Sequence, residues 1–449
     1  MTLAFGTDGV RGDARRELTP AFVEALGGAA AAVLGGDRLA VGRDPRASGP
    51  DLVRALCRGV QRAGAAAVDL GVVPTPAVAR WCEDEQVAGA MVSASHNLWH
   101  DNGVKLFAPG GRKLDDEAQR EIERRLAAGS DLAPTDPSMQ AGAAAGEDAG
   151  EKALRRHVRA VAASIEGRDL EGLRIVIDAA NGAAYRSGPE CLRALGADIE
   201  TVHASPDGYN INAGCGSMHP GSLQAAVVSC GADAGVAFDG DADRVLAVDA
   251  GGDLVDGDQI LAVCAIDRAR RGQLRGDAVV VTVMANLGLR QAMKAHRIDV
   301  VETPVGDRHV LGALEERGLV LGGEQSGHLI FRDLATTGDG LLTAVQLLDV
   351  VKRSGRSLRD LAAAAMTRRP QVLVGVPRPA AARHADLGAA LGPIAAGAAA
   401  RLGASGRVLV RPSGTEPLVR VMVEATDLET ARAEADRLAA AITEALSCW

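Results

Sequence analysis

Short apolar segments alternate with amphipathic segments along most of the chain. Strand-like runs occur at 38–42, 65–70, 87–92, 173–178, 235–238, 245–249, 277–283, 299–302 and 319–321. Helix-like spacing of apolar residues follows several of them, as at 52–63 and 115–127. Strands that alternate with helices predict an α/β fold with largely parallel sheets.

The pattern changes near residues 367–370. Beyond it lie strand-like segments at 371–376, 408–411 and 418–424, an alanine-rich helix, and a last helix from Leu428. This block predicts a compact α+β domain of about 80 residues. Earlier in the chain, Ala128–Gly150 is small, polar and proline-bearing, which predicts a linker or mobile loop. His157 lies in a helical stretch, where we expect it on the surface.

Composition narrows the classes of protein. The chain has 449 residues, 47% of them hydrophobic and 24% charged, which excludes wholesale disorder. The net charge of −9 and the scarcity of aromatic residues, 2%, argue against a nucleic-acid partner. Seven cysteines without a CxxC pair argue against a zinc ribbon. No basic leader followed by an apolar core and no apolar run of bilayer length is present, so we expect a soluble cytoplasmic protein without a membrane partner.

Two segments carry residues suited to phosphoryl chemistry. The first, Met91–Asn97, is an apolar strand ending in Ser-Ala-Ser-His-Asn. Ser95 at a strand end is placed as a nucleophile or phosphate acceptor, although an ordinary Ser/Asn turn has the same composition. The second segment holds Asp239, Asp241 and Asp243, which share one face if the chain there is extended. Three such carboxylates favour a hard cation such as Mg²⁺ or Ca²⁺, the alternative being a solvated acidic turn.

Two further loops carry polar groups. Residues 320–328, Val-Leu-Gly-Gly-Glu-Gln-Ser-Gly-His, present a carboxylate, an amide, a hydroxyl and an imidazole, which suit sugar hydroxyls and amines. Residues 410–417, Val-Arg-Pro-Ser-Gly-Thr-Glu-Pro, with Arg420 beyond, offer arginines, hydroxyls and a glycine to a phosphate. Either loop could be an ordinary turn. Together, a serine, a cation site, a sugar binder and a phosphate clamp indicate phosphoryl transfer on a phosphosugar.

In this order the motifs resemble those of the α-D-phosphohexomutases. The match runs from Gly6-Thr-Asp-Gly-Val-Arg-Gly12, through Ser-His-Asn, Asp-Gly-Asp-Ala-Asp-Arg and Gly-Glu-Gln-Ser-Gly-His, to Ser-Gly-Thr-Glu-Pro. It implies three related α/β domains with mixed sheets and a smaller C-terminal α+β domain around a central cleft. With the loops as guides, we predict domains at 1–155, 156–255, 256–369 and 370–449.

Within the family, the chain is most similar to members that act on glucosamine phosphates. Asn181-Gly-Ala-Ala-Tyr185, Asn210-Ile-Asn212, Cys215-Gly-Ser217 and Gln325 carry that similarity. It implies interconversion of glucosamine 6-phosphate and glucosamine 1-phosphate, on the route to UDP-N-acetylglucosamine, through a phosphoserine and a sugar 1,6-bisphosphate. Mg²⁺ is the implied cofactor, and glucosamine or glucose 1,6-bisphosphate the implied activator. We expect a monomer or a homodimer.

The resemblance also implies roles for individual residues. Ser95 corresponds to the phosphorylated serine and, with Asp239, Asp241 and Asp243, to the Mg²⁺ ligands. Arg11 and Arg244 correspond to arginines beside the transferring group, and Lys105 and His328 to the groups that could move the hydroxyl proton. Glu324 and Ser326 correspond to residues that contact the sugar hydroxyls. The clamp on the other phosphate corresponds to Arg411, Ser413, Gly414, Thr415 and Arg420.

Two questions stay open at this stage. A phosphomannomutase or phosphoglucomutase is an alternative within the family, because Gln325 alone argues for an amino sugar; a phosphosugar hydrolase or a non-catalytic sensor would be alternatives of another class. The chain also departs from the family at Leu98, where proline usually follows Ser-His-Asn. Losing that proline removes a fixed φ, so we expect a looser loop and no loss of a chemical group.

Overall fold

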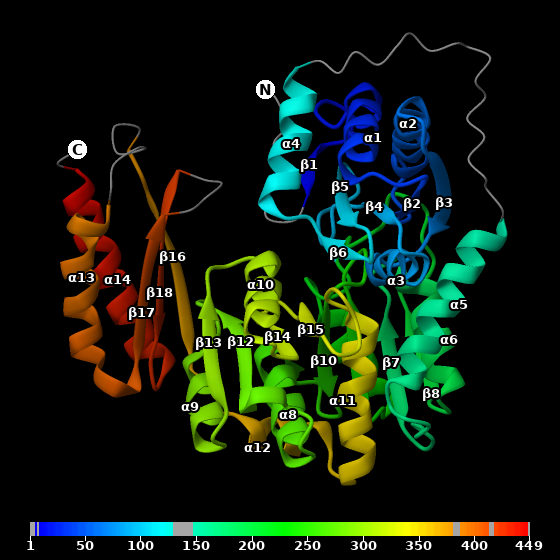
Figure 1. The fold of residues 1–449 in the computed structure, drawn as a ribbon. Coiled ribbons are helices and arrows are strands. Elements are labelled where there is room, and N and C mark those ends of the chain that lie inside the picture. The colour runs from blue at the N-terminus through cyan, green and yellow to red at the C-terminus, as the bar shows by residue number, and fades with distance from the viewer. Residues whose placement is uncertain (1–4, 7–8, 129–146, 380–386, 413–416, 448–449) are drawn as a thin grey trace. The chain divides into compact units, whose positions relative to one another are not determined.

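The computed structural model describes residues 5–6, 9–128, 147–379, 387–412 and 417–447. The chain divides into two compact units, one formed by residues 1–284 with 297–365 and the other by residues 285–296 with 366–449. We refer to them as unit 1 and unit 2. Figure 1 shows four sheets coloured in chain order from blue to red, three of them in unit 1 and one in unit 2.

The first sheet of unit 1 is mixed. Its order is β1-β5-β4-β2-β3, with β6 paired to β5; β2 pairs in parallel with β3 and β4, whereas β4–β5, β1–β5 and β5–β6 are antiparallel. The strands are β1 (Val10–Asp13), β2 (Arg38–Arg43), β3 (Ala66–Val72), β4 (Ala88–Val92), β5 (Asp101–Ala108) and β6 (Arg112–Lys113). Its helices are α1 (Pro20–Leu34), α2 (Gly49–Arg62), α3 (Thr75–Glu85), α4 (Asp116–Ala127) and α5 (Glu147–Ala163).

Helices cover both faces of this sheet, because β4 and most of β5 are buried and apolar on both sides. One apolar core joins the sheet to α1, α2 and α4, and another joins it to α3 and α5. Part of the high glycine content serves the first core. A Cβ on Gly59 of α2 would lie 1.9 Å from the carbonyl oxygen of Glu24 in α1, so glycine lets these two helices approach closely.

The second and third sheets repeat the strand pairing of the first. Their orders are β11-β10-β9-β7-β8 and β13-β12-β14-β15, with β7 and β12 in the parallel central position that β2 has in the first sheet. The strands are β7 (Arg174–Asp178), β8 (Asp198–Val202), β9 (Ala234–Phe238), β10 (Val245–Asp249), β11 (Leu254–Val255), β12 (Ala278–Thr282), β13 (Asp299–Thr303), β14 (Leu321–Gly323) and β15 (Leu329–Phe331). The helices along this part of the chain are α6 (Ala184–Ala194), α7 (Gly221–Cys230), α8 (Gly257–Arg270), α9 (Leu287–Ala295), α10 (Asp307–Arg317), α11 (Gly340–Ser354) and α12 (Leu358–Ala365).

The repeated topology places the candidate loops at equivalent positions. In each sheet of unit 1, a parallel strand passes into an antiparallel neighbour through one short connection: β4 to β5, β9 to β10 and β14 to β15. These connections hold Ser95, the three aspartates and residues 324–328, respectively. The repetition supports three related α/β domains and explains why the reactive residues fall at strand ends.

Unit 2 contains an antiparallel sheet of order β16-β18-β17 with helices packed on it (Figure 1). Its strands are β16 (Gln371–Pro377), β17 (Arg407–Pro412) and β18 (Leu418–Glu424), and the helices on the sheet are α13 (Gly388–Leu402) and α14 (Leu428–Leu446). The segment at 413–417 connects β17 to β18. The predicted fold class, α/β with mixed sheets and a smaller C-terminal sheet domain, is confirmed.

Two expectations about the intervening segment need correction. Glu147–Gly150, which we assigned to a linker, begins α5, and a Cβ on Gly150 would lie 2.5 Å from the carbonyl oxygen of Leu70, so the helix packs closely on β3 there. Residues 129–146 of the same stretch lie outside the described residues. His157 is buried rather than on the surface, and its Nε2 lies 2.8 Å from Oδ2 of Asp339, the N-cap residue of α11.

Candidate functional site

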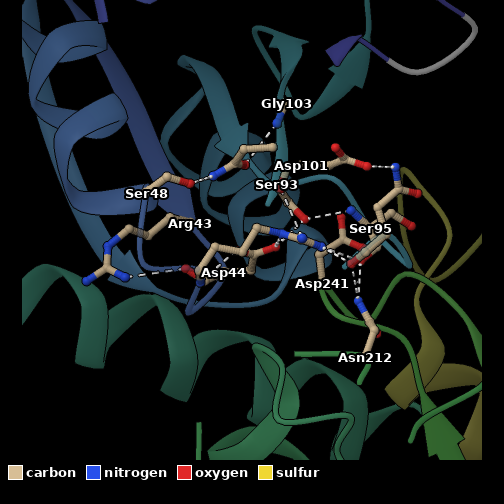
Figure 2. A network of polar contacts seen from close by, with 12 residues as sticks. Arg43, Asp44, Ser48, Ser93, Ser95, Asp101, Gly103, Asn212 and Asp241 are labelled. Carbon is tan, nitrogen blue, oxygen red and sulfur yellow. Dashed lines mark hydrogen bonds and ion pairs between the residues drawn. The ribbon is translucent and has the colours of Figure 1, made fainter. Parts of the chain in front are cut away.

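The loop after β4 holds Ser95 in an uncommon backbone conformation. The Ser95 φ is 53°, in the left-handed region that costs a non-glycine residue roughly 1–2 kcal/mol. A chain of hydrogen bonds secures it: Ser95 N donates to Ser93 Oγ at 2.9 Å, and Ser93 Oγ donates to Asp44 Oδ2 at 2.6 Å. Figure 2 shows these three residues close together. The surrounding structure therefore fixes where the Ser95 hydroxyl lies.

That hydroxyl faces the acidic loop between β9 and β10. Ser95 Oγ donates to Asp239 Oδ2 at 2.7 Å, and both side chains are fully buried. Asp239, Asp241 and Asp243 each bring a carboxylate oxygen within 4.8 Å of the others. Burial, followed by the charges of Asp243 and Asp241, raises the pKa of Asp239 well above its usual value. A cation among these groups would relieve that cost.

The three carboxylates converge for a different reason from the one expected. Residues 239–244 form a turn, with Ala242 at a φ of 59°, and are not an extended segment with alternating faces. The turn is closed by Arg244 N, which donates to Asp239 Oδ1 at 3.2 Å. Asp239, Asp241 and Asp243 thus meet by chain reversal.

Lys105 enters this cluster from β5. Its Nζ lies 2.8 Å from Asp241 Oδ2 and 2.6 Å from Asp243 Oδ2, and the residue is 3% exposed. Thr75 Oγ1, at the start of α3, also donates to Asp241 Oδ2 at 2.6 Å. The other oxygen of that carboxylate, Asp241 Oδ1, is buried and has no hydrogen-bond partner among the described residues. An all-oxygen donor set with a buried oxygen left to coordinate fits a hard divalent cation.

Arg244 and His96 lie on the serine side of the cluster. Arg244 Nη1 is 3.2 Å from His96 Nδ1, which is itself 3.4 Å from Ser95 Oγ. Burial, with the nearby charges of Arg244 and Arg11, lowers the pKa of His96 to about 4. His96 is therefore a neutral imidazole near pH 7, and Arg11 on β1 acts on the same neighbourhood through its charge. Cations and a neutral ring suit a site that receives a phosphate dianion.

The loop between β14 and β15 is anchored to the second sheet. Val245 N, at the start of β10, donates to Gly327 O at 3.1 Å, and a Cβ on Gly327, whose φ is 91°, would lie 2.2 Å from Val245 O. Glu324 Oε1 accepts from Gly306 N at 3.3 Å, and Ser326 is exposed. Gln325 Nε2 donates to Oδ2 of Asp256, the N-cap residue of α8, at 3.3 Å.

His328 closes the same loop and is buried. Burial lowers its pKa, and its Nε2 lies 4.0 Å from Asp307 Oδ2, which forms an ion pair with Lys113. Neither ring nitrogen has a hydrogen-bond partner among the described residues. The ring lies against Gly338, where a Cβ would be 2.2 Å from Nε2. Burial therefore favours the neutral imidazole, in which one ring nitrogen carries a hydrogen and the other can accept a proton.

In unit 2, the strand register sets two arginines side by side. Arg411 of β17 pairs with Arg420 of β18. Like charges directly opposite one another on an antiparallel pair are destabilising unless something neutralises them. Arg411 Nε is buried without a hydrogen-bond partner among the described residues. This arrangement suits an anion, while Ser413, Gly414 and Thr415 lie outside the described residues.

Several residues around Ser95 have no counterpart in the sequence expectations. They are Asp44, Arg46, Thr75, Ser93 and His96; Asn212 stands in the Asn-Ile-Asn motif, to which no role in the site was assigned. Ser93 and His96 stand inside the serine motif, so the motif itself could have indicated them. Asn212 and Thr75 lie 117 and 166 residues from their partners Ser95 and Asp241, so the sequence did not indicate either contact.

Comparisons with known proteins match this architecture. Family models described as phosphoglucomutase/phosphomannomutase match the whole series: α/β/α domain I at residues 2–132, domain II at 155–252, domain III at 256–369 and the C-terminal domain at 371–441. The chain belongs to the phosphoglucomutase/phosphomannomutase family. The resemblance to the α-D-phosphohexomutases is confirmed.

Individual relatives extend this result. The chain is 50% identical to a phosphoglucosamine mutase of Thermobifida fusca over 460 residues, covering 100% of this chain and 99% of the relative. It is 51% identical to the Streptomyces coelicolor phosphoglucosamine mutase over 455 residues, covering 99% and 100%. Among solved structures, a Burkholderia thailandensis phosphoglucomutase/phosphomannomutase family protein aligns with a TM-score of 0.80 at 24% identity, covering 98% of this chain and 97% of that one. None of the described helices combines the length and apolar character needed to cross a membrane.

Proposed function

We propose that this protein interconverts glucosamine 6-phosphate and glucosamine 1-phosphate, with Ser95 as the phosphoryl carrier. The observation that carries the proposal is the buried contact of Ser95 Oγ with Asp239 at 2.7 Å, beside Lys105 and Arg244. The curated relatives at about half identity are phosphoglucosamine mutases over the full length, so the reaction is that of an isomerase. A binding protein would need no such buried hydroxyl among charged groups.

The reaction divides into two transfers at the same serine. In the first, the bond between Ser95 Oγ and phosphorus breaks, and the phosphoryl group bonds to a free hydroxyl of the sugar monophosphate. The product is a 1,6-bisphosphate. After the sugar turns round, its other phosphate moves to Ser95 Oγ, which leaves the isomerised monophosphate and the phosphoserine. Sugar bisphosphate can therefore act as activator, because it phosphorylates Ser95 directly.

The residues of the chain contribute mainly position and charge. Transferring phosphoryl groups carry charge on their outer oxygens, so fixed cations lower the barrier. We assign this part to Lys105, Arg244 and Arg11. In the first transfer the sugar hydroxyl must lose a proton, and in the second the sugar oxygen that releases its phosphate must gain one. His328 is assigned as the acceptor in preference to Lys105, because the Lys105 ammonium is engaged with two carboxylates and the ring nitrogens of His328 have no hydrogen bond.

Asp239, Asp241 and Asp243, with an oxygen of the Ser95 phosphate, would hold Mg²⁺. When bound, the ion would supply stabilisation of negative charge on the transferring group. A related structure, the N-acetylphosphoglucosamine mutase of Aspergillus fumigatus, was solved with GlcNAc-6P and magnesium; it aligns with a TM-score of 0.67 at 21% identity, covering 99% of this chain and 96% of that one. In our chain the donor set itself supports the assignment.

The remaining binding roles follow from the loops. Glu324 and Ser326 would contact sugar hydroxyls, and Arg411, Ser413, Gly414, Thr415 and Arg420 would hold the phosphate that is not being transferred. Because Gln325 is bonded to Asp256, it does not by itself decide between an amine and a hydroxyl on the sugar. The preference for an amino sugar rests on the curated relatives. The four-domain boundaries, a cytoplasmic location and a monomeric or dimeric state stay predictions.

One assay tests the function. Purified protein with Mg²⁺ and a trace of glucose 1,6-bisphosphate is given glucosamine 6-phosphate, glucose 1-phosphate or mannose 1-phosphate in parallel. We expect the glucosamine phosphate to have the highest kcat/KM. Faster turnover of a sugar without the amine would favour a phosphoglucomutase or phosphomannomutase, and free phosphate as the main product would favour a hydrolase.

A further inference from the structure

Two donors from different parts of unit 1 bind the same two carbonyl oxygens of the Ser95 loop. Arg46 lies between β2 and α2, and its Nη2 donates to Ser95 O at 2.9 Å and to Asn97 O at 2.8 Å. Asn212 lies between β8 and α7, and its Nδ2 donates to the same two oxygens, each at 2.9 Å. We call Arg46 and Asn212, together with these two carbonyls, the carbonyl clamp. Figure 2 shows the Asn212 side chain pointing toward the Ser95 loop.

The clamp uses all the hydrogen-bonding capacity of the groups that meet there. The Arg46 Nη2 and Asn212 Nδ2 atoms carry two hydrogens each, and each carbonyl oxygen has two lone pairs. Four hydrogen bonds therefore satisfy both donors and both acceptors. A fully satisfied buried polar network holds a single arrangement more firmly than its pairs would separately.

Arg46 also fixes the rest of the loop. Its Nη1 donates to Asp101 O at 3.0 Å and to Leu98 O, and its Nε donates to Asp44 Oδ2 at 2.9 Å. The side chain is fully buried. One guanidinium thus binds four backbone carbonyls between residues 95 and 101 and leaves the Ser95 hydroxyl to the acidic loop.

Asn212 is in turn held by its own sheet. It has a left-handed φ of 57°, and its N donates to Ala180 O at 2.9 Å. Asp178, at the end of β7, secures this segment by accepting from Ala180 N and Gly216 N, both at 2.9 Å. The Asn212 amide therefore links the Ser95 loop to the segment that follows β7 of the second sheet.

The acidic loop packs against the same point. A Cβ on Gly240 would lie 2.6 Å from Ser95 O and 2.8 Å from Asn212 Nδ2. Glycine at this position lets the backbone between Asp239 and Asp241 touch the clamp directly. The phosphoryl carrier and the carboxylates are thereby connected through backbone and amide groups, in addition to the contact between Ser95 Oγ and Asp239.

We propose that Arg46 and Asn212 are positioning residues, whose clamp holds the Ser95 phosphate in line for the sugar oxygen through both transfers. The proposal rests on the proposed function. A loosened clamp would let water compete, since water oxygen would bond to phosphorus as the bond to Ser95 Oγ breaks, releasing inorganic phosphate. Small misplacements of reacting atoms can cost about 100-fold in rate. The clamp thus protects the phosphoserine as well as directing it.

The test replaces Asn212 and uses its neighbour as a matched control. Asn212→Ala removes the two amide hydrogen bonds to the Ser95 loop. Asn210→Ala changes the same residue type in the same segment; among the described residues, the Asn210 side chain donates to Ser205 O and accepts from Asp207 N. Arg46→Lys is a second variant that retains the charge. Thermal unfolding first defines a temperature at which all three variants are folded.

Each phosphoenzyme is labelled with ³²P on Ser95, and two rates are measured. For Asn212→Ala we expect kcat with glucosamine 6-phosphate to fall about tenfold or more, KM to change less than about threefold, and labelled phosphate to be released faster, even without sugar. Asn210→Ala should match the parent in both rates. The proposal is overturned if Asn212→Ala hydrolyses its phosphoserine at the parent rate, or if Asn210→Ala shows the same defect. If Arg46→Lys does not fold, the Asn212 pair decides.

The sugar-free hydrolysis rate separates this proposal from the proposed function. It compares variant with parent without any mutase turnover. A parent phosphoenzyme that transfers nothing to glucosamine 6-phosphate would contradict the proposed function, whatever the hydrolysis rates of the variants.

Discussion

The Ser95 loop and the acidic loop occupy equivalent places in two related sheets, yet different forces hold them. The Ser95 loop, after β4, is fixed through its backbone carbonyls by Arg46 and Asn212, which lie outside it. The acidic loop, after β9, also has outside donors on its backbone carbonyls, Ala183 N on Gly240 O at 2.8 Å and Gly340 N on Ala242 O at 3.0 Å. In addition, Lys105 and Thr75 engage its functional carboxylates. The same topology thus supports two ways of building a reactive turn.

Because the two loops are held differently, the positioning of a reactive group can be tested separately from its chemistry in one loop and not in the other. The serine loop can lose its support while its nucleophile stays intact, so its variants should reveal misdirected transfer. In the acidic loop the functional carboxylates themselves are engaged by Lys105, so a change to that lysine alters the support and the reacting environment at once. Changes there should alter turnover, cation binding and stability together.

The largest effect is expected at the nucleophile. Ser95→Ala should lower turnover by more than about a thousandfold, because no other group can carry the phosphoryl group. Intact-mass measurement should show no phosphate on this variant. Ser93→Ala provides the comparison within the loop, since it removes the support of Ser95 N and retains the carrier; we expect a loss of only about tenfold. If the two variants lost equal activity, the claim that Ser95 carries the phosphoryl group while Ser93 only positions it would be contradicted.

Next comes the cation that balances the acidic loop. Lys105→Met should lower kcat about 100-fold, because a fixed positive charge leaves the site of transfer. It should also enlarge the rise in melting temperature that Mg²⁺ produces, since the ion no longer shares Asp241 and Asp243 with an ammonium group. Thermal unfolding with Mg²⁺ or with chelator measures this. Lys113→Met, which removes a lysine paired with Asp307, should leave the Mg²⁺-dependent rise unchanged.

A smaller effect is expected in unit 2, where like charges face each other. Arg411→Met should raise KM about tenfold with little change in kcat, because the phosphate held there is bound alike before and during transfer. It removes one of the two facing arginines, so we expect the free energy of unfolding to change by less than about 1 kcal/mol. Steady-state kinetics and denaturant unfolding test both. Arg437→Met on α14 is the control, and a fall in kcat with unchanged KM would contradict the assignment.

The smallest effect is expected at Leu98, where the family usually has proline. Leu98 is 43% exposed, and its carbonyl already accepts from Arg46. Leu98→Pro should therefore stabilise the protein by about 0.4–1 kcal/mol through the unfolded chain, with kcat changed less than twofold. Several-fold faster turnover in this variant would show that the clamp leaves the loop loose.

Much of the fold and the chemistry could be predicted from the sequence. The apolar runs at 87–92 and 173–178 predict buried strands, and the reactive residues lie where such runs end. Ser95 and Asp239 are recognisable because their chemistry is local to one motif.

The remainder depends on pairs distant in the chain. Arg46 donates to carbonyls 49 and 51 residues away, and the buried His157 contacts an aspartate 182 residues away. An alternating pattern also could not show that residues 239–244 turn. Left-handed residues at Ser95 and Ala242 follow from tertiary contacts that local propensity does not encode.

The central claim is that Ser95 carries the phosphoryl group between the two positions of one sugar. It is tested most directly by ³²P-labelled phosphoenzyme, mixed with one equivalent of unlabelled glucosamine 6-phosphate and quenched within a single turnover. The account predicts label in sugar bisphosphate and then in glucosamine monophosphate, with little in inorganic phosphate. Label that stays on Ser95 while glucosamine 1-phosphate forms, or that appears only as inorganic phosphate, would contradict it.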